Sequence, residues 1–456
     1  MKTGNSVLIR NGIIVGAHTI VQSDIFIENG KIKTIGRCTD KADRIIDADG
    51  YYVTPGGVDP HVHFHLPTPA GFSADNFHSG TLAALAGGTT TIIDFVTPER
   101  NQSYLDAYQK RMEEAKGALA DYSFHMSPTW FGKDSEKEIA ECISLGMKSF
   151  KVYTAYQDAI GIDYETIGEV MKAVKANHGI LLAHCEDEDI IKNGRKEVLK
   201  LNIPEQEKHP LSRKSEAEIK AIEKIISLAQ KTACPVYVVH ISTGKGAGLI
   251  AEAQRNHIPV YGETCPQYLL LDERKYRYNF SNSSVFVMSP PLRKSEDNKE
   301  LWKFMINGGI QSVGTDHCPF MLGQKQFGAE DFRKIPNGAG GVENRMALLY
   351  TYGVLEEKIT LNQWVQLCST NPAHIFGLSS RKGDIKEGLD ADLVVWNPEK
   401  GQTIHASTHQ SKADVSVYEG MKTKASQEYV LRRGEIVLDR GKLIDEISSG
   451  EFIKQD

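Results

Sequence analysis

Two histidines separated by one residue, His61 and His63, could bind one metal ion together. Residues i and i+2 of a β-strand point to the same face, so both imidazoles would reach the same point in space. Neutral imidazole is a common ligand of zinc. The pair is a weak signal by itself, because a His-x-His on a strand also occurs where no metal binds.

Four further candidate ligands follow along the chain: Lys151, His184, His240 and Asp316. Imidazole and carboxylate groups suit zinc and other divalent cations, whereas an ammonium would be repelled by them. Lys151 makes sense as a ligand only if its amine has reacted with CO₂ to give a carbamate, an anion able to bridge two metal ions. The other interpretation of Lys151 is a lysine in a salt bridge. A two-metal site lowers the pKa of a water molecule enough to make it a nucleophile at neutral pH.

The elements that must position these residues are short strand-like segments in the middle of the chain, which alternate with helical segments. The strand-like segments are residues 58–64, 90–95, 122–127, 149–153, 180–184, 236–241, 260–263 and 311–315. Strand–helix alternation indicates parallel pairing, and eight units favour a closed (β/α)₈ barrel of the α/β class. All six candidate ligands fall at or near the carboxyl ends of these strands, where barrel enzymes place their active residues. On periodicity alone, an open doubly wound sheet is the alternative.

Helical spacing of apolar residues predicts helices over residues 102–119, 135–145 and 214–231. Residues 204–214 contain two prolines and many polar side chains, so we expect a loop there, at the barrel mouth. Both ends of the chain are rich in strand signals instead. These strands are expected at 6–10, 12–15, 24–27, 31–35, 391–396, 415–418, 428–432 and 435–438, with Asn29-Gly30 as a hairpin turn.

The composition is that of an ordinary globular protein and excludes some classes of partner. The 456 residues carry a formal net charge of −6, and this mild acidity does not indicate the basic surface that is typical of proteins that bind nucleic acid. No apolar run is long enough to cross a membrane. The seven cysteines are scattered and include no Cys-x-x-Cys, which favours reduced thiols in the cytoplasm over a disulfide framework.

Nine short motifs give a more specific indication of the family. They are VDPHVH (58–63), SFKVY (149–153), LAHCE (182–186), VHIS (239–242), ETCPQY (263–268), SPPLR (289–293), GTDHCP (314–319), PNG (336–338) and GLDADLV (388–394). As a set, spread over nearly the whole chain, they resemble the cyclic amidohydrolases, the family that contains the dihydropyrimidinases and D-hydantoinases.

The resemblance implies roles for individual residues. It implies that His61, His63 and Asp316 hold one Zn²⁺ ion, that His184 and His240 hold a second, and that N6-carboxylated Lys151 bridges the two. Asp316 would act as general base and then general acid. Tyr156 would donate a hydrogen bond to the developing oxyanion. Ser289 and Asn337 would hold the cyclic amide through their main-chain groups.

The resemblance also implies a domain organisation and an assembly. Residues 55–384 would form the metal-dependent hydrolase barrel, and residues 1–54 and 385–456 would pair into a small β-sandwich domain beside it. Members of the family commonly form homotetramers, so a homotetramer is expected here.

The reaction implied is the hydrolytic opening of a 5,6-dihydropyrimidine or a 5-substituted hydantoin to an N-carbamoyl amino acid. Allantoinase, or another hydrolase of cyclic ureides, is the alternative. A dihydroorotase is disfavoured because no arginine follows the His-x-His. His65 departs from the family pattern and would either contact a polar ring substituent or face Asp75 in the 68–76 loop. A non-catalytic oligomeric scaffold is disfavoured because all six ligand positions are kept.

Several residues beside the candidate ligands also need an interpretation. Cys185 and Cys318 are expected to pack in the core rather than bind metal. His317 would either orient a neighbouring ligand or lie on the rim as an ordinary histidine. The acidic run at 186–189 is expected to be a solvated helix start rather than a further metal site.

Overall fold

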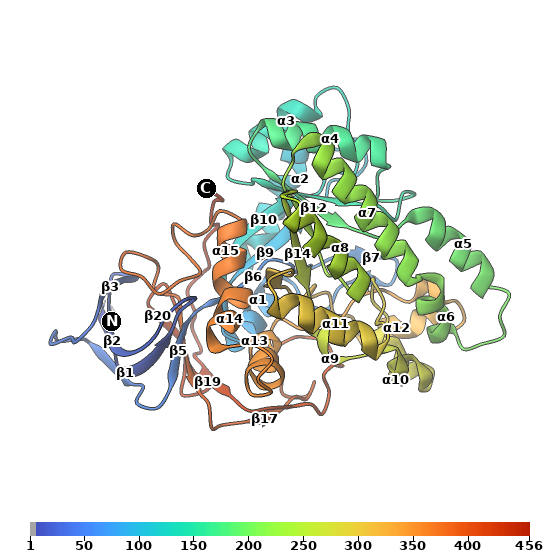
Figure 1. Cartoon of the computed structure of the whole chain (residues 1–456). Coiled ribbons are helices and arrows are strands. Elements are labelled where there is room, and N and C mark those ends of the chain that lie inside the picture. The colour runs from blue at the N-terminus through green and yellow to red at the C-terminus, as the bar shows by residue number, and fades with distance from the viewer. Residues whose placement is uncertain (1–5) are drawn as a thin grey trace.

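The computed structural model describes residues 6–456 and contains a barrel of parallel strands surrounded by helices (Figure 1). The strands are β6 (Gly57–Asp59), β9 (Thr89–Val96), β10 (Asp121–Met126), β11 (Ser149–Tyr153), β12 (Ile180–His184), β13 (Val236–Val238), β14 (Val260–Thr264) and β15 (Ser312–Val313), and they are neighbours in chain order. A parallel bridge between Val62 and His317 joins the segment after β6 to the segment after β15. The predicted (β/α)₈ barrel is therefore confirmed. The open doubly wound sheet is wrong, because its first and last strands would not meet.

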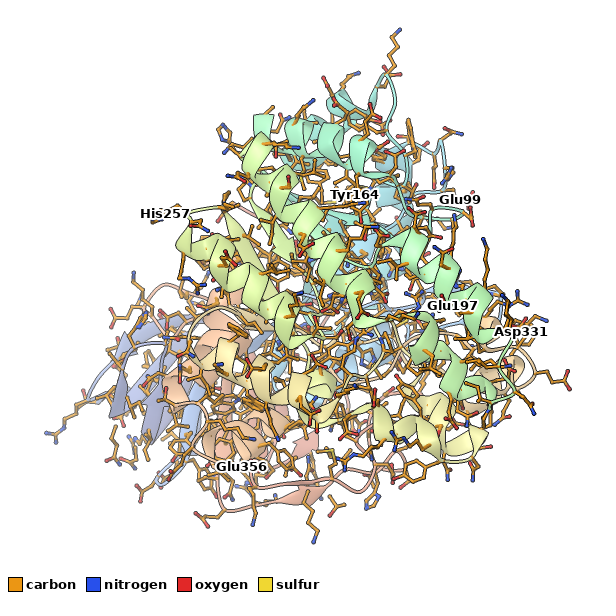
Figure 2. All side chains as sticks on the ribbon, turned by 45° about the vertical axis from the view of Figure 1, so that its right-hand side comes forward. Glu99, Tyr164, Glu197, His257, Asp331 and Glu356 are labelled. Atoms are coloured by element: carbon orange, nitrogen blue, oxygen red, sulfur yellow. The ribbon has the colours of Figure 1, made fainter. Side chains whose placement is uncertain are left out.

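The barrel strands are covered on both faces. Every residue of β9, β10, β11 and β12 is buried, and side chains fill the space between the sheet and the surrounding helices (Figure 2). Strands buried on both faces have nearly continuous apolar sequences. This explains why the predicted ranges 149–153 and 180–184 coincide with β11 and β12.

The first barrel strand is shorter than predicted. It ends at Asp59 rather than at residue 64, because Pro60 has no N–H to continue the ladder. The Asp59 carboxylate instead accepts a hydrogen bond from the main-chain N–H of His61 at 3.2 Å. His61 and His63 thus lie on the extended segment that follows the strand.

Helices cover the outside of the barrel. They are α1 (Phe77–Ala86), α2 (Tyr104–Glu114), α3 (Ser135–Ser144), α4 (Tyr164–Ala176), α5 (Glu188–Val198), α6 (Glu205–Ser212), α7 (Ser215–Thr232), α8 (Gly244–Arg255), α9 (Pro266–Leu270), α10 (Phe280–Ser283), α11 (Ser295–Ile306), α12 (Leu322–Lys325), α13 (Arg345–Leu349), α14 (Leu361–Val365) and α15 (Asn371–Ile375). The helices α4, α7, α8 and α11 lie side by side (Figure 1). The predicted helices at 102–119, 135–145 and 214–231 correspond to α2, α3 and α7.

The expected polar loop at 204–214 is wrong, because this segment forms α6. Pro204 stands just before the helix, where its missing N–H costs nothing. Gln206 and His209 are buried at a spacing of three residues, so the helix has one inward face. Two prolines suggested a loop, but this buried face stabilises the helix despite Pro210.

Strands from both chain ends form a separate sheet beside the barrel (Figure 1). It contains β1 (Ser6–Val15), β2 (Ile20–Glu28), β3 (Lys31–Ile35), β4 (Arg44–Asp47), β5 (Tyr52–Pro55), β16 (Leu393–Asn397), β19 (Ser426–Arg432), β20 (Glu435–Asp439) and β21 (Lys442–Leu443). Antiparallel pairing of β5 with β16 joins the two ends. Buried aliphatic residues from both ends, such as Val53 and Val395, share one core cluster. The expected association of the two ends is confirmed.

Two details of this region differ from expectation. The predicted strands 6–10 and 12–15 are one strand, β1, with a bulge between Ile9 and Gly12. The predicted strand at 415–418 is wrong, because those residues lie in turns. The hairpin at Asn29-Gly30 is confirmed, with φ values of 53° and 79° that suit a tight two-residue turn.

Short strands complete the structure. The 68–76 segment begins with the small hairpin of β7 (Pro67–Thr68) and β8 (Gly71–Phe72), and β17 (Gln402–Thr403) pairs with β18 (Lys422–Thr423). Within residues 6–456, none of the helices combines the length and the apolar character needed to cross a membrane.

Candidate metal centre and active site

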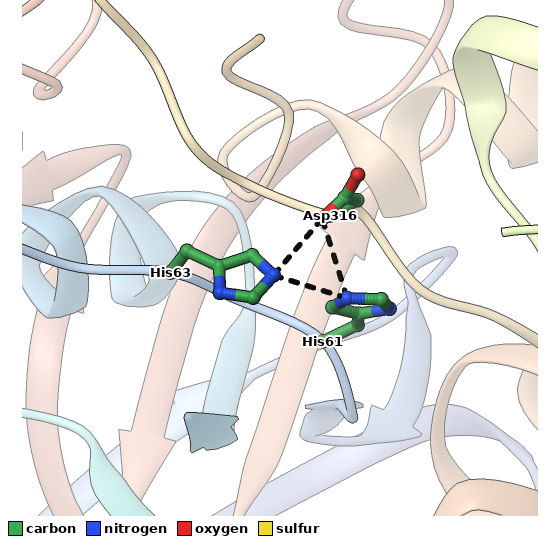
Figure 3. A group of neighbouring side chains, drawn as sticks. All are labelled: His61, His63 and Asp316. Atoms are coloured by element: carbon green, nitrogen blue, oxygen red, sulfur yellow. Dashed lines mark hydrogen bonds and ion pairs between the residues drawn. The ribbon is translucent and has the colours of Figure 1, made fainter. Parts of the chain in front are cut away.

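Three predicted ligands meet where the barrel closes (Figure 3). The Nε2 atoms of His61 and His63 are 3.2 Å apart, and each lies 3.2 Å from Oδ1 of Asp316. Zinc–nitrogen bonds of about 2.0–2.1 Å in a tetrahedron place neighbouring ligand atoms roughly 3.3 Å apart. The three side chains therefore fit one metal ion without rearrangement.

A second pair of ligand atoms lies next to this group. His184 ends β12 and His240 follows β13, and the distance from His184 Nδ1 to His240 Nε2 is 3.0 Å. The ring of His240 lies 5.3 Å from that of His61, between centroids. His240 also has a positive φ of 41°, and such strained positions cluster at functional sites. The structure thus brings all four predicted histidines together.

Lys151 lies between the two groups with an unusual environment for a lysine. Its side chain is fully buried in β11, and among the described residues its Nζ has no hydrogen-bond partner and no salt bridge. The Nζ atom lies 4.9 Å and 5.0 Å from the ring centroids of Phe95 and Tyr153. Burial lowers the pKa of Lys151 to about 8, so the neutral amine that reacts with CO₂ is accessible near neutral pH. These observations fit a carbamate better than a salt-bridged lysine.

Two buried glutamates fix the orientation of two of the imidazoles. Glu263 accepts from His61 Nδ1 at 2.8 Å, and Glu186 accepts from His184 Nε2 at 3.0 Å. In each case the other ring nitrogen is left facing the metal position. The Arg213 guanidinium also contacts Glu186 and, with His184, holds the pKa of that carboxyl at about 2 in spite of its burial.

The expected solvated helix start at 186–189 is only partly right. Asp187 does cap α5, accepting from the N–H of Ile190. Glu186 and Glu188 are buried, however, because both carboxylates have partners in the site region. The Glu188 carboxylate accepts the main-chain N–H of Tyr156 at 2.6 Å.

His317 is a buried link rather than an ordinary histidine on the rim. Its Nδ1 accepts from the N–H groups of Gly341 and Val342, so its Nε2 carries the proton and donates to Asp75 at 3.0 Å. Asp75 also accepts from the Ser411 hydroxyl. This network ties the segment that carries Asp316 to the 68–76 segment and to the C-terminal part of the chain.

The expected contact between the His65 side chain and Asp75 is wrong. Only the main-chain N–H of His65 meets Asp75, donating to its carbonyl at 2.7 Å. The imidazole stacks instead on the ring of Phe72, with 4.0 Å between centroids and 11° between planes. Phe72 is half exposed, so this stacked pair lies at the surface of the small β7–β8 hairpin.

Tyr156 stands in the loop after β11, close to the imidazoles. Its ring lies 5.4 Å from that of His184 and 4.9 Å from the Arg213 guanidinium. Burial raises the pKa of Tyr156, and Arg213 opposes that rise. The hydroxyl therefore stays protonated at neutral pH and can donate a hydrogen bond.

Ser289 and Asn337 lie on two neighbouring segments that are joined by a hydrogen bond from Gly338 N–H to the Val287 carbonyl, at 3.0 Å. The 335–339 segment also contacts the segment of Asp316, through the parallel bridge between His317 and Ala339. Cys185 and Cys318 are buried free thiols whose pKa values are raised by burial, as expected for core residues.

Comparisons with known proteins identify the family of this barrel. The model of the amidohydrolase family matches residues 52–437, and the chain belongs to that family. Membership implies the use of a divalent metal ion, for which the cluster of His61, His63 and Asp316 is a candidate site.

Individual relatives match this chain over nearly its full length. A D-hydantoinase from Geobacillus stearothermophilus is 38% identical over 98% of this chain and 96% of its own. A dihydropyrimidinase from Rattus norvegicus is 36% identical, covering 99% and 89%. The crystal structure of dihydropyrimidinase from Brevibacillus agri NCHU1002 superposes with a TM-score of 0.97 at 36% identity, covering 99% of both chains.

Sequence reasoning missed the two orienting glutamates. Glu186 follows a candidate ligand by two residues, and Glu263 is the last residue but one of β14, the strand next to β13 in the barrel. A carboxylate at the end of a barrel strand beside a histidine ligand is the signal that could have identified them.

Proposed function

We propose that this chain is a binuclear metal-dependent hydrolase that opens a cyclic amide, a 5,6-dihydropyrimidine or a 5-substituted hydantoin, to an N-carbamoyl amino acid. The observation that carries the proposal is the convergence of four imidazoles, one carboxylate and a buried lysine amine at one end of the barrel; this amine has no hydrogen-bond partner among residues 6–456. The names of the relatives, D-hydantoinase and dihydropyrimidinase, supply the substrate class.

In this proposal His61, His63 and Asp316 would hold one divalent cation, most simply Zn²⁺, and His184 and His240 would hold another. Carboxylated Lys151 would be a ligand shared by both. When bound, the cations supply a water molecule of lowered pKa and polarise the ring carbonyl. The imidazoles suit zinc as ligands, and Glu186 and Glu263 keep the correct ring nitrogens directed into the site.

The protein groups then handle protons and charge. Oδ1 of Asp316 faces the two histidines, which leaves Oδ2 available for a proton. The attacking water forms a C–O bond to the carbonyl carbon of the ring and loses a proton to this oxygen. Asp316 then gives the proton to the ring nitrogen as the C–N bond breaks. The Tyr156 hydroxyl donates to the carbonyl oxygen as negative charge develops there.

The experiment is hydrolysis of dihydrouracil, hydantoin, allantoin and dihydroorotate by zinc-loaded protein, with metal content measured on the same sample. Turnover of dihydrouracil or hydantoin with about two metal ions per chain is expected, as a shared-water site requires. Preferred turnover of allantoin would replace the substrate class. Two metal ions with no turnover of any ring would refute the activity while leaving the metal centre.

We further propose a cytoplasmic homotetramer. The seven cysteines are all free and buried, which suits a reducing compartment. The tetramer rests on the family resemblance alone, and sedimentation velocity tests it directly.

A further inference from the structure

Two short main-chain segments beside the candidate site share an unusual hydrogen-bonding pattern. In the first, the carbonyls of Met288 and Pro290 accept from His209 Nε2 at 2.8 Å and from the Tyr268 hydroxyl at 2.7 Å. The carbonyl of Ser289, between them, accepts no hydrogen bond from any residue in 6–456. A side chain therefore fixes the carbonyl on each side of one free acceptor.

The second segment repeats this pattern around Asn337. The carbonyls of Pro336 and Gly338 both accept from Nζ of Lys325, at 2.7 Å and 2.8 Å. Within the described part of the chain, the carbonyl of Asn337 accepts no hydrogen bond. Both carbonyls belong to half-buried residues with buried neighbours on each side, so each of these residues is more exposed than the residues that flank it.

Lys325 joins the two segments. It ends α12, is fully buried, and donates a third hydrogen bond to the Val287 carbonyl at 2.9 Å. The three donors of its ammonium are thus all used. No carboxylate pairs with Lys325 in the described residues, and its nearest ring is that of Phe320, at 5.4 Å. Burial lowers the pKa of Lys325 to about 7, and a buried lysine without a counter-ion is costly, so its presence needs an explanation beyond packing.

We infer that Lys325 is a positioning residue for the substrate, which holds the main-chain carbonyls of Ser289 and Asn337 as a pair of fixed acceptors for ring N–H groups. This inference rests on the proposed function. Two acceptors fit a ring that offers two N–H donors, as in the –NH–CO–NH– unit of a cyclic ureide. A ring methylated at one nitrogen would leave one of these carbonyls buried without a hydrogen bond. The cost of that unpaired acceptor would make the site select the unmethylated ring over the methylated one.

The location of the segments supports this assignment. The hydrogen bond from the Gly338 N–H to the Val287 carbonyl joins the Ser289 segment to the Asn337 segment, and the Asn337 segment contacts the segment that carries Asp316. The main chain at Gly338 packs closely against Cys318, because a Cβ added at Gly338 would lie 2.3 Å from the Cys318 carbonyl oxygen. The two acceptors are therefore held next to the groups proposed to act on the ring.

The test compares Lys325→Met with the wild-type protein, and Lys334→Met serves as a matched control on an exposed lysine near the same segment. The substrates are dihydrouracil and its two N-methyl derivatives. We expect Lys325→Met to keep its metal content, to raise KM about 10- to 100-fold with a much smaller change in kcat, and to lose selectivity for the unmethylated ring by a similar factor. Lys325→Arg, which keeps the charge and the donors, should recover part of the loss.

The outcomes separate this inference from the proposed function. If the wild-type protein neither opens nor binds any of the rings in calorimetry, both are wrong. If it opens dihydrouracil and folded Lys325→Met keeps the wild-type KM, or loses activity equally on all three rings, only the inference is overturned. Should Lys325→Met fail to fold, His209→Phe and His209→Gln provide the second comparison. His209→Phe should raise KM and reduce N–H selectivity, and His209→Gln should do so much less; equal values for the two variants overturn the inference.

Discussion

Replacing Glu263 by glutamine tests whether the buried carboxylates tune the metal centre. Glu263 accepts three hydrogen bonds: from His61 Nδ1 at 2.8 Å, from the Tyr237 hydroxyl at 2.8 Å and from the main-chain N–H of His240 at 3.0 Å. A glutamine keeps one acceptor oxygen in place of two and adds an NH₂ group that faces donors. Burial raises the pKa of Glu263 to about 7, and glutamine removes the negative charge by which the ionised carboxylate makes the His61 imidazole a better ligand.

The size of the effect follows from these contacts. Loss of an orienting partner of this kind weakens metal binding about 10- to 100-fold, or about 1.4–2.7 kcal/mol. The effect should be greatest for the ion that we propose is held by His61, His63 and Asp316. Glu186→Gln should instead weaken the binding of the other ion, because Glu186 orients His184.

The assay is competition of each apoprotein with a zinc chelator of known affinity, which resolves two binding steps. Glu197→Gln is the control, since Glu197 is an exposed residue of α5 (Figure 2) whose pairing with Lys214 contributes little. Melting temperatures establish that each variant is folded. Both zinc affinities of Glu263→Gln within twofold of wild type would refute this reasoning.

Three other perturbations have definite expected outcomes. Lys151→Ala should lose most bound metal and activity, with partial rescue by short-chain carboxylic acids that replace the carbamate; full activity without rescue would exclude the bridging role. Asp75→Asn should lower stability by about 2 kcal/mol at neutral pH, because the pKa of Asp75 is about 2 in the folded protein instead of the ordinary 3.8. That contribution is present above pH 3.8 and is lost as the pH falls towards 2, so melting curves of wild type and variant should converge in acid; a constant difference would contradict it. Gly80→Ala should destabilise the protein by about 1–3 kcal/mol, because the new Cβ would lie 2.2 Å from the ring of Phe64; an unchanged melting temperature would show that the ring can move.

The fold could be predicted where local pattern and burial agree. The apolar strands β11 and β12 were located to the residue, since both faces of each strand are buried and the ends are sharp. The 204–214 segment was mispredicted, because its stability comes from an inward face that depends on contacts made elsewhere. Proline content is a local signal and carries no information about such contacts.

The candidate ligands could be found from residue type and strand position, but their supporting contacts could not. Glu186 was expected to face solvent, because its pairing with Arg213 joins positions 27 residues apart through the fold. No sequence pattern singled out Lys325, for the same reason. Its three acceptors come from two segments that are adjacent only after the barrel has closed.

The bridge between Val62 and His317 makes the metal centre part of the closure of the barrel. His61 and His63 belong to the first strand segment and Asp316 to the last, so a cation bound by all three would cross-link the two edges of the sheet. Because the three ligands meet only when the edges are together, the free energy of metal binding would favour the closed ring over any state in which the edges separate. Metal loading and completion of the fold would then be coupled events, and a metal-free barrel would open first along this seam.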